Sequence, residues 1–155
     1  MATDIQLIKQ FLDAYQSLDH NAMAACYGES AQFSDIAFRL QGRKPIHAMW
    51  HMICANGIEV EVQDVKEHAG EVHARIVDTY VFSDTGRPVV NPILCRFQCR
   101  DGLILQQIDE CDALLWARQA FGGIKGEIVG RAGFMRRTAA RRKLQRFIAK
   151  HPEYS

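Results

Sequence analysis

The fold is decided by residues 71–110, which read EVHARIVDTYVFSDTGRPVVNPILCRFQCRDGLILQQIDE. Apolar and polar residues alternate through much of this stretch, which is the period of a strand with one buried face. Asp84-Thr85-Gly86 and Asp101-Gly102 interrupt the alternation with turn sequences. The stretch therefore predicts three strands joined as antiparallel hairpins, at about 72–82, 89–100 and 103–112.

The preceding residues predict one further strand and three helices. Ile58, Val60 and Val62 alternate with polar residues, which indicates a strand over about 58–69. Thr3 and Gln6 have the spacing of a capping box, and apolar residues recur at helical spacing after them. We expect helices at about 3–18, 19–27 and 43–55, with a short extended piece at 31–36. Helices followed by a strand meander indicate an α+β fold with a curled antiparallel sheet.

The charges are unevenly distributed along the 155 residues. Residues 1–124 hold 10 Lys and Arg against 16 Asp and Glu, a net charge of −6, whereas residues 125–155 hold 9 against 2, a net charge of +7. We therefore expect a body over residues 1–122 and a basic helical extension over 123–155, packed on the same domain or on a partner subunit. Within it, residues 134–150 predict a basic helix, and residues 112–122 predict a short helix before it.

The composition points to a globular protein of the cytoplasm. There is no run of about 18 apolar residues and no basic-then-apolar N-terminus, so we expect neither a transmembrane segment nor a secretory signal. The five cysteines are an odd number and include no CxxC pair, which is typical of free thiols in a reducing compartment.

Two carboxylates fall on strand faces that are otherwise mostly apolar. Strand alternation puts Asp78 on one face with Ile76 and Tyr80, and puts Asp109 on one face with Leu105 and Cys111. A carboxylate buried there must be hydrogen-bonded, paired with a cation or protonated. The sequence therefore predicts an unusual environment for both groups.

Three local patterns in this order resemble the nuclear transport factor 2-like superfamily, with its SnoaL-like and ketosteroid isomerase-like branches nearest. The patterns are YGESAQFSD at 27–35, LQGR at 40–43 followed by IHAMW at 46–50, and RDGLILQQID at 100–109. The resemblance covers about residues 5–122. It implies a cone-shaped half-barrel, in which a bent antiparallel sheet wraps around the N-terminal helices and leaves a pocket at its open end. It also implies a homodimer formed through the convex face of the sheet.

The resemblance also implies roles for individual residues. Asp35 matches the general base of ketosteroid isomerase-like enzymes, and Asp109 resembles the acid/base residue of SnoaL-like cyclases. Phe11 and Leu94 stand where the isomerases have their two oxyanion donors, which puts steroid-type isomerisation in doubt, although Tyr15 lies one turn beyond Phe11.

Structural roles remain open for the same carboxylates. Asp35 could instead close a turn at the end of its strand. Asp109 could be paired with His47 or His51, and Asp78 could bond Tyr80 or a neighbouring backbone group.

The two histidines at positions 47 and 51 lie four residues apart on one helix face. This spacing can bind zinc, but the glutamate of a metalloprotease motif is missing, so we expect no metal. We prefer His51 as a proton relay in the pocket, because the ordinary pKa of histidine suits that role. Epoxide hydrolase chemistry with an Asp-Arg-Asp network is disfavoured, since Arg75, Arg96 and Arg100 fall on the outward strand faces.

The remaining candidates for the pocket are mainly apolar and aromatic, which is usual for small-molecule sites. Together with Asp78, the expected ligand-binding residues are Phe33, Phe38, Trp50, Tyr80, Phe82, Ile93 and Phe97. Each could equally be a core residue.

The basic helix has three possible roles. It could pack its apolar stripe on the acidic body, bind nucleic acid through phosphates, or lie on an anionic membrane. We favour packing, because the acidic body offers a partner. Nucleic acid is disfavoured, because no aromatic residues are interleaved with the basic ones.

Two functional hypotheses follow from these features. The first is a protein that binds a small apolar molecule and, if it is an enzyme, performs cofactor-free isomerisation, cyclisation or dehydration. Asp35 and Asp109 would then exchange protons, with His51 or Tyr15 donating to the oxyanion. The alternative is a non-catalytic ligand-binding or protein-interaction module of the same fold.

Overall fold

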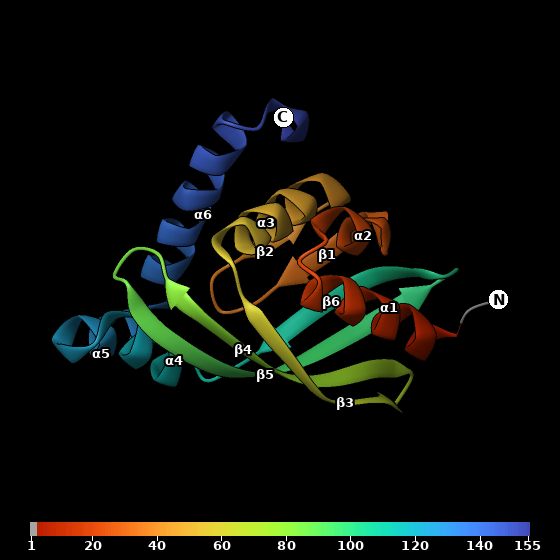
Figure 1. Cartoon of the computed structure of the whole chain (residues 1–155), viewed down its shortest axis with the longest axis horizontal. Helices are drawn as coiled ribbons and strands as arrows, with labels where there is room; N and C mark the ends of the chain where they lie inside the picture. The colour runs from red at the N-terminus through yellow and green to blue at the C-terminus, as the bar shows by residue number, and fades with distance from the viewer. Residues whose placement is uncertain (1–2) are drawn as a thin grey trace.

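The computed structural model describes residues 3–155 and shows helices packed on one six-stranded sheet (Figure 1). No helix in this range is long and apolar enough to cross a membrane. The helices are α1 (Asp4–Gln16), α2 (His20–Ala25), α3 (Arg43–Asn56), α4 (Ala113–Phe121), α5 (Gly123–Arg131), α6 (Gly133–Ala149) and the short 3-10 helix η1 (Pro152–Tyr154). The strands are β1 (Tyr27–Ser34), β2 (Arg39–Gln41), β3 (Glu59–His68), β4 (Glu71–Phe82), β5 (Arg87–Arg100) and β6 (Leu103–Glu110).

The sheet has the order β2-β1-β6-β5-β4-β3, and the strands β3 to β6 form the expected antiparallel meander. The sheet as a whole is mixed, however, because β1 pairs with β6 in parallel. Hairpin sequences determine the direction of β3 to β6, whereas β1 reaches the sheet from another part of the chain. The α+β half-barrel is confirmed, and its purely antiparallel character is corrected.

A β-bulge in the last hairpin changes one predicted face. The register of β5 with β6 shifts between Gln98 and Cys99, which are opposite Gln106 and Ile104. The extra residue is Leu105, which is 37% exposed, while Ile104 is fully buried. The predicted inward position of Leu105 was therefore wrong, because a bulge breaks strict alternation. Asp109 keeps the predicted orientation because it lies beyond the bulge.

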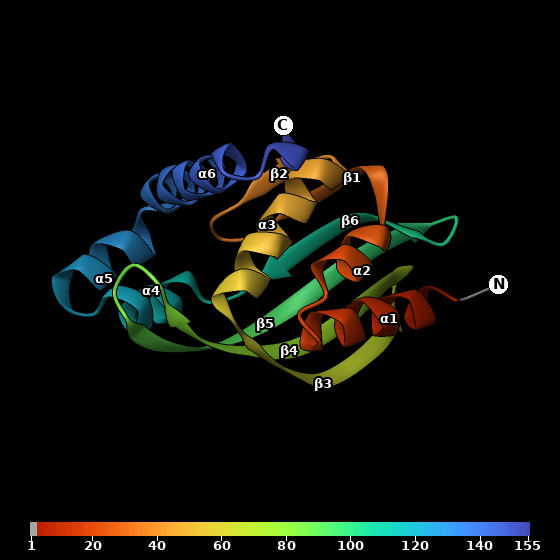
Figure 2. The ribbon, with the colours of Figure 1, turned by 45° about the horizontal axis from the view of Figure 1, so that its top comes forward.

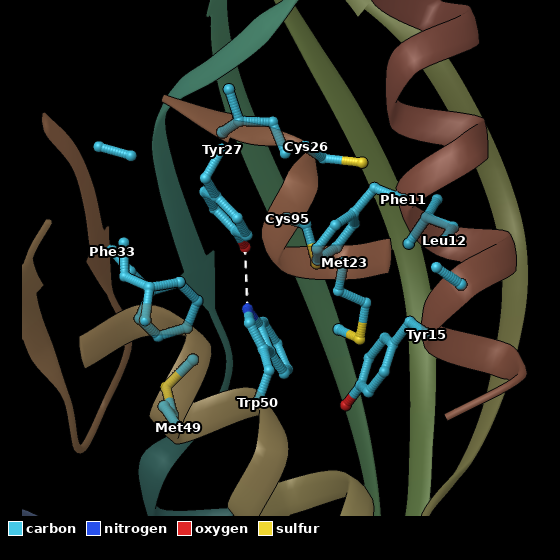
Figure 3. Close-up of a cluster of buried hydrophobic side chains, with 14 of the residues drawn as sticks. Phe11, Leu12, Tyr15, Met23, Cys26, Tyr27, Phe33, Met49, Trp50 and Cys95 are labelled. Atoms are coloured by element: carbon cyan, nitrogen blue, oxygen red, sulfur yellow. Dashed lines mark hydrogen bonds between the residues drawn. The ribbon is translucent and has the colours of Figure 1, made fainter. Parts of the chain in front are cut away.

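The first three helices cover the concave face of the sheet (Figures 1 and 2). An aromatic cluster fills the space between α1, α3 and the strands, with Phe11 at its centre (Figure 3). The rings of Tyr27, Trp50 and Phe97 lie 5.6, 5.8 and 5.7 Å from the Phe11 ring, in edge-to-face arrangements. Such pairs add to the free energy gained by burial alone.

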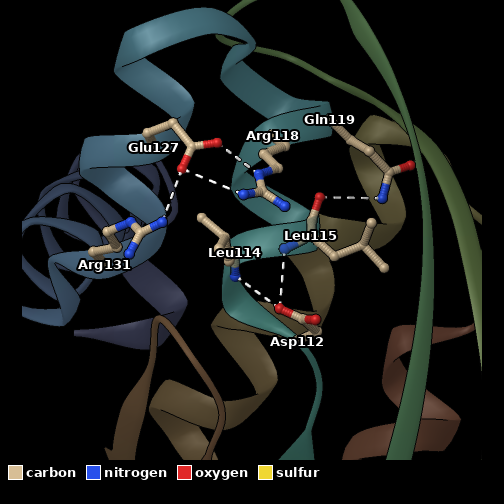
Figure 4. A network of polar contacts seen from close by, with 7 residues as sticks. All are labelled: Asp112, Leu114, Leu115, Arg118, Gln119, Glu127 and Arg131. Atoms are coloured by element: carbon tan, nitrogen blue, oxygen red, sulfur yellow. Dashed lines mark hydrogen bonds and ion pairs between the residues drawn. The ribbon is translucent and has the colours of Figure 1, made fainter.

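The sequence only partly predicts the helices α4 and α5 and the tight reversal between them. The carboxylate of Asp112 accepts hydrogen bonds from the first amides of α4, as expected of an N-cap. The additional helix α5 is tied back to α4 through Glu127, which contacts Arg118 and Arg131 (Figure 4). Gly122 and Gly123 have positive φ angles and allow the tight reversal between α4 and α5.

Helix α6 packs on α3 of the same chain mainly through apolar side chains. Leu144 is 4% exposed within the core, and the Phe147 ring lies 5.1 Å from the His51 ring. Within residues 3–155 the one ion pair between a basic residue of α6 and the acidic body joins Lys143 to Asp84. Most of the positive charge on α6 therefore does not hold the helix in place.

We expect Leu144→Ala to loosen α6 selectively, because a large-to-small change in a core costs about 2–5 kcal/mol. Faster proteolysis after α5 and a lower free energy of unfolding would show this. Arg142→Gln is the control, because Arg142 is exposed and has no acidic partner among the described residues. Loosening by Lys143→Gln but not by Leu144→Ala would mean that charge holds the helix.

Candidate functional site

A cavity of about 460 Å³ lies between the concave face of the sheet, α3 and the C-terminal helices. It is lined by 10 of the 12 residues selected from the sequence as catalytic or ligand-binding. These are Tyr15, Phe33, Asp35, Phe38, Trp50, Asp78, Tyr80, Phe82, Ile93 and Asp109. The structure thus brings these residues together, and their roles in binding or catalysis remain predictions.

Phe97 does not line the cavity. It is fully buried in the core against Phe11. Alternation correctly places it on the concave face, but that end of the face is covered by α1.

Asp78 is held by a tyrosine from the first helix. The hydroxyl of Tyr15 donates to Oδ2 of Asp78 over 3.0 Å, and Asp78 is only 6% exposed. Within residues 3–155, its other oxygen, Oδ1, has no hydrogen-bond donor. The structure therefore places the predicted bonding partner of Asp78 on α1 rather than at Tyr80, and leaves one carboxylate oxygen free at the cavity wall.

Asp109 is positioned by a chain of hydrogen bonds through the core. Nε2 of Gln107 donates to Oδ1 of Asp109 over 2.9 Å, and the hydroxyl of Tyr27 donates to Oε1 of Gln107. The indole of Trp50 donates to the Tyr27 hydroxyl over 3.0 Å (Figure 3). This chain fixes the orientation of the Gln107 amide, so its donor end points at Asp109.

Asp35 serves a turn and lines the cavity at the same time. Its Oδ1 accepts hydrogen bonds from the amides of Ala37 and Phe38, over 2.7 and 2.6 Å. This is the turn-closing role considered above, and it occupies one carboxylate oxygen. The side chain nevertheless belongs to the cavity wall.

Burial raises the pKa values of all three carboxyl groups. The pKa of Asp78 rises to about 7, although the hydrogen bond from Tyr15 opposes the shift. The pKa of Asp109 also rises to about 7 through burial, against the hydrogen bond from Gln107 and with a contribution from the charge of Asp35. Burial raises the pKa of Asp35, opposed by its two amide donors. Two carboxyls of one cavity can therefore gain and lose protons near neutral pH.

Several cavity residues were missed by the sequence analysis. Asn91 has the inward parity of Ile93 and could have been found by the same alternation. Trp116 of α4 donates to the hydroxyl of Tyr80 over 2.7 Å. Helix α6 contributes Arg136 to the wall, a contact between distant segments that no local pattern indicates.

Arg136 is nevertheless bound to backbone oxygens. Its guanidinium donates to the carbonyls of Ile36, Val129 and Gly130 over 2.9–3.1 Å. Within residues 3–155 it forms no ion pair with a carboxylate, so an Asp-Arg-Asp network is not assembled.

His51 lies outside the cavity, which corrects its predicted role there. Its ring stacks on His20 at 3.8 Å, and its Nδ1 lies 2.9 Å from the hydroxyl of Tyr154. His47 Nε2 lies 2.9 Å from Nδ1 of His20. The face shared by the two histidines points toward α2 and η1, not toward the sheet. No group of three or more potential metal-ligating side chains occurs in the described part of the chain.

We expect Asp109→Asn to stabilise the protein more at pH 8 than at pH 5. An unfolded aspartate ionises near pH 4, so between about pH 4 and 7 the folded protein holds a proton that the unfolded chain releases. The free energy of unfolding contributed by Asp109 therefore falls as the pH rises from about 4 to 7. Asparagine does not titrate, so the variant avoids this fall and gains most at pH 8. Chemical denaturation at both pH values measures the difference. An equal effect at both would contradict the raised pKa, and Asp64→Asn on exposed β3 is the control.

Comparison with solved structures supports the fold. A protein with a ketosteroid isomerase-like fold from Catenulispora acidiphila, solved in complex with trimethylamine, has a TM-score of 0.66 and 16% identity, covering 76% of this chain and 94% of that one. An LEH-like epoxide hydrolase of M. tuberculosis has a TM-score of 0.62 and 20% identity, covering 84% and 93%. A candidate polyketide cyclase of Pseudomonas putida has a TM-score of 0.66 and 17% identity, covering 77% and 99%. At these identities the likeness shows the fold alone.

The comparison with curated proteins gives no match. The model of the SnoaL-like domain matches residues 8–107, which include most of α1, all of α2 and α3, strands β1 to β5 and part of β6. Three of the four aspartates that line the cavity lie in this range. The chain therefore belongs to the SnoaL-like family.

Proposed function

We propose that this protein binds a small, largely apolar carbonyl compound in the cavity and catalyses a proton transfer on it. The observation that carries the proposal is the presence of two carboxyl groups, Asp78 and Asp109, whose pKa values are both raised to about 7 in one cavity. Near neutral pH, one can be ionised and accept a proton while the other is protonated and donates one. Isomerisation, aldol cyclisation and dehydration next to a carbonyl can all be catalysed by such a pair.

Asp109 is the better base and Asp78 the better acid. The amide of Gln107 and the thiol of Cys95 both donate to Asp109 and favour its ionised form, whereas Asp78 has one such donor, the hydroxyl of Tyr15. A protonated Asp78 can donate from its free Oδ1 to a carbonyl oxygen, while Tyr15 holds Oδ2. Tyr15 therefore positions Asp78 rather than donating to the substrate itself. A hydrogen bond that strengthens as an oxyanion develops lowers the barrier to the reaction.

The walls of the cavity favour an apolar substrate. Aromatic and aliphatic side chains from α3, the strands and the C-terminal helices surround the carboxyls. Such a lining excludes water and keeps the electrostatic interactions of the carboxyls strong. A structural neighbour described as a candidate polyketide cyclase is consistent with a cyclic or polycyclic carbonyl compound as the substrate.

A non-catalytic binding module is the second candidate. Asp35 favours it, because its amide hydrogen bonds give this carboxylate a structural role at the turn. The same cavity would then hold a ligand without changing it.

We also propose a homodimer formed through the convex face of the sheet. Val90 on β5 is 49% exposed and Leu105 on β6 is 37% exposed on that side. Burying such side chains against a second copy would remove them from water.

The catalytic proposal is tested with 2-decalone, a bicyclic ketone that belongs to the proposed class of small, apolar carbonyl compounds. We expect the protein to accelerate exchange of its α-hydrogens in D₂O, with a maximum near pH 7 because one carboxyl must be ionised and the other protonated. Asp109→Asn and Asp78→Asn should each lower the rate by about 10²–10⁴-fold, measured by mass spectrometry.

The control is Asp64→Asn, which should leave the exchange rate unchanged because Asp64 is exposed on β3, away from the cavity lining. Equal rates in the wild-type protein and both cavity variants would contradict catalysis by this pair. Binding of the ketone without exchange would favour the non-catalytic module.

A further inference from the structure

Two buried oxygen atoms of the cavity have no hydrogen-bond donor within residues 3–155. They are Oδ1 of Asp78 and Oδ1 of Asn91, and each side chain is only 6% exposed. Both residues line the cavity. A buried acceptor without a donor costs free energy, so a ligand that supplies the donor gains affinity from it.

The two acceptors come from neighbouring strands at the same level. Asp78 on β4 is directly opposite Asn91 on β5 in the antiparallel register. Side chains that are directly opposite project from the same face of a sheet, with Cβ atoms about 5 Å apart. One small functional group of a ligand can therefore reach both oxygens.

The other polar atoms of these two side chains are already engaged. Oδ2 of Asp78 accepts from the hydroxyl of Tyr15. The Asn91 side chain lies near the thiol of Cys111, and it opposes the rise to about 11 that burial causes in the pKa of Cys111. Within residues 3–155 the carbonyl oxygen of Asn91 has no donor, so it is the atom left for a ligand.

This arrangement selects among functional groups. A hydrocarbon leaves both oxygens without a donor, and a ketone, which only accepts, leaves Asn91 unsatisfied. A hydroxyl donates to Asn91 and can also accept from a protonated Asp78. An ammonium group would need Asp78 to be ionised and would bring charge into a mainly apolar cavity.

We propose that the natural ligand of the cavity carries a hydroxyl group that donates to Oδ1 of Asn91, beside the carbonyl oxygen that accepts from Asp78. The inference rests on the proposed function for the cavity as the site of an apolar carbonyl compound, and it narrows that class to hydroxylated compounds. Asn91 is then a residue that determines specificity, and its position on β5 is set by the strand register.

The test compares ligands that share one carbon skeleton. Decalin, 2-decalone, 2-decalol and 2-decalylamine are titrated against the protein, and binding is followed by the fluorescence of Trp50 and Trp116, both of which line the cavity. We expect 2-decalol to bind on the order of 10-fold more tightly than decalin or 2-decalone, because it satisfies a buried acceptor that they leave open. The affinity of 2-decalol relative to that of 2-decalylamine should rise as the pH falls from 8 to 6.

Asn91→Leu keeps the size of the side chain and removes the acceptor, so 2-decalol should lose its advantage over decalin. Gln98→Leu, an exposed position on the same strand, is the matched control. The comparison of ligands on the wild-type protein remains decisive if Asn91→Leu fails to fold.

The outcomes separate this inference from the proposed function. Equal affinities for decalin, 2-decalone and 2-decalol would overturn the hydroxyl site while leaving an apolar ligand site in place. A preference for 2-decalylamine at every pH would also overturn it. Failure of all four ligands to bind would instead contradict the cavity as a small-molecule site, and with it both proposals.

Discussion

The burial of carboxyl groups in one apolar cavity is the constraint on which the rest of the structure depends. Asp78 on β4 and Asp109 on β6 lie on either side of β5, and both line a cavity whose other walls are mainly aromatic and aliphatic side chains. Tyr15 and Gln107 provide donors, but burial outweighs them and raises both pKa values to about 7. The fold therefore holds two carboxyl groups that titrate near neutral pH, and their burial costs stability above that pH.

The hydrophobic core and the candidate site form one connected network. The chain from Trp50 through Tyr27 and Gln107 to Asp109 links α3, β1 and β6, and Tyr15 links α1 to Asp78 on β4. The aromatic rings that fill the core therefore also orient the polar atoms of the cavity. A side chain whose rotamer is locked by packing can hold an acid/base group in place without paying for reorganisation during the reaction.

Local patterns predicted most of the sheet and selected 10 residues that the structure brings to one cavity, because strand alternation and turn sequences act over a few residues. Alternation placed Asp78, Tyr80 and Asp109 correctly, and would have found Asn91. It failed at Leu105, where a bulge adds a residue, and it could not distinguish the covered end of the concave face, where Phe97 lies, from the open end. His51 and Arg136 depend on how distant segments pack, which no short pattern encodes. The basic charge of α6 was equally uninformative, because apolar contacts hold that helix.

The raised pKa values of the cavity carboxyls are the central claim, and NMR titration of ¹³C-labelled aspartate side chains tests them most directly. Asp78→Asn and Asp109→Asn assign the two signals, since each removes one resonance. The account predicts that both carboxyl resonances shift with midpoints near pH 7, well separated from those of exposed aspartates near pH 4. Midpoints below pH 5 for both would contradict it, because two carboxylates ionised throughout the neutral range could not form an acid/base pair.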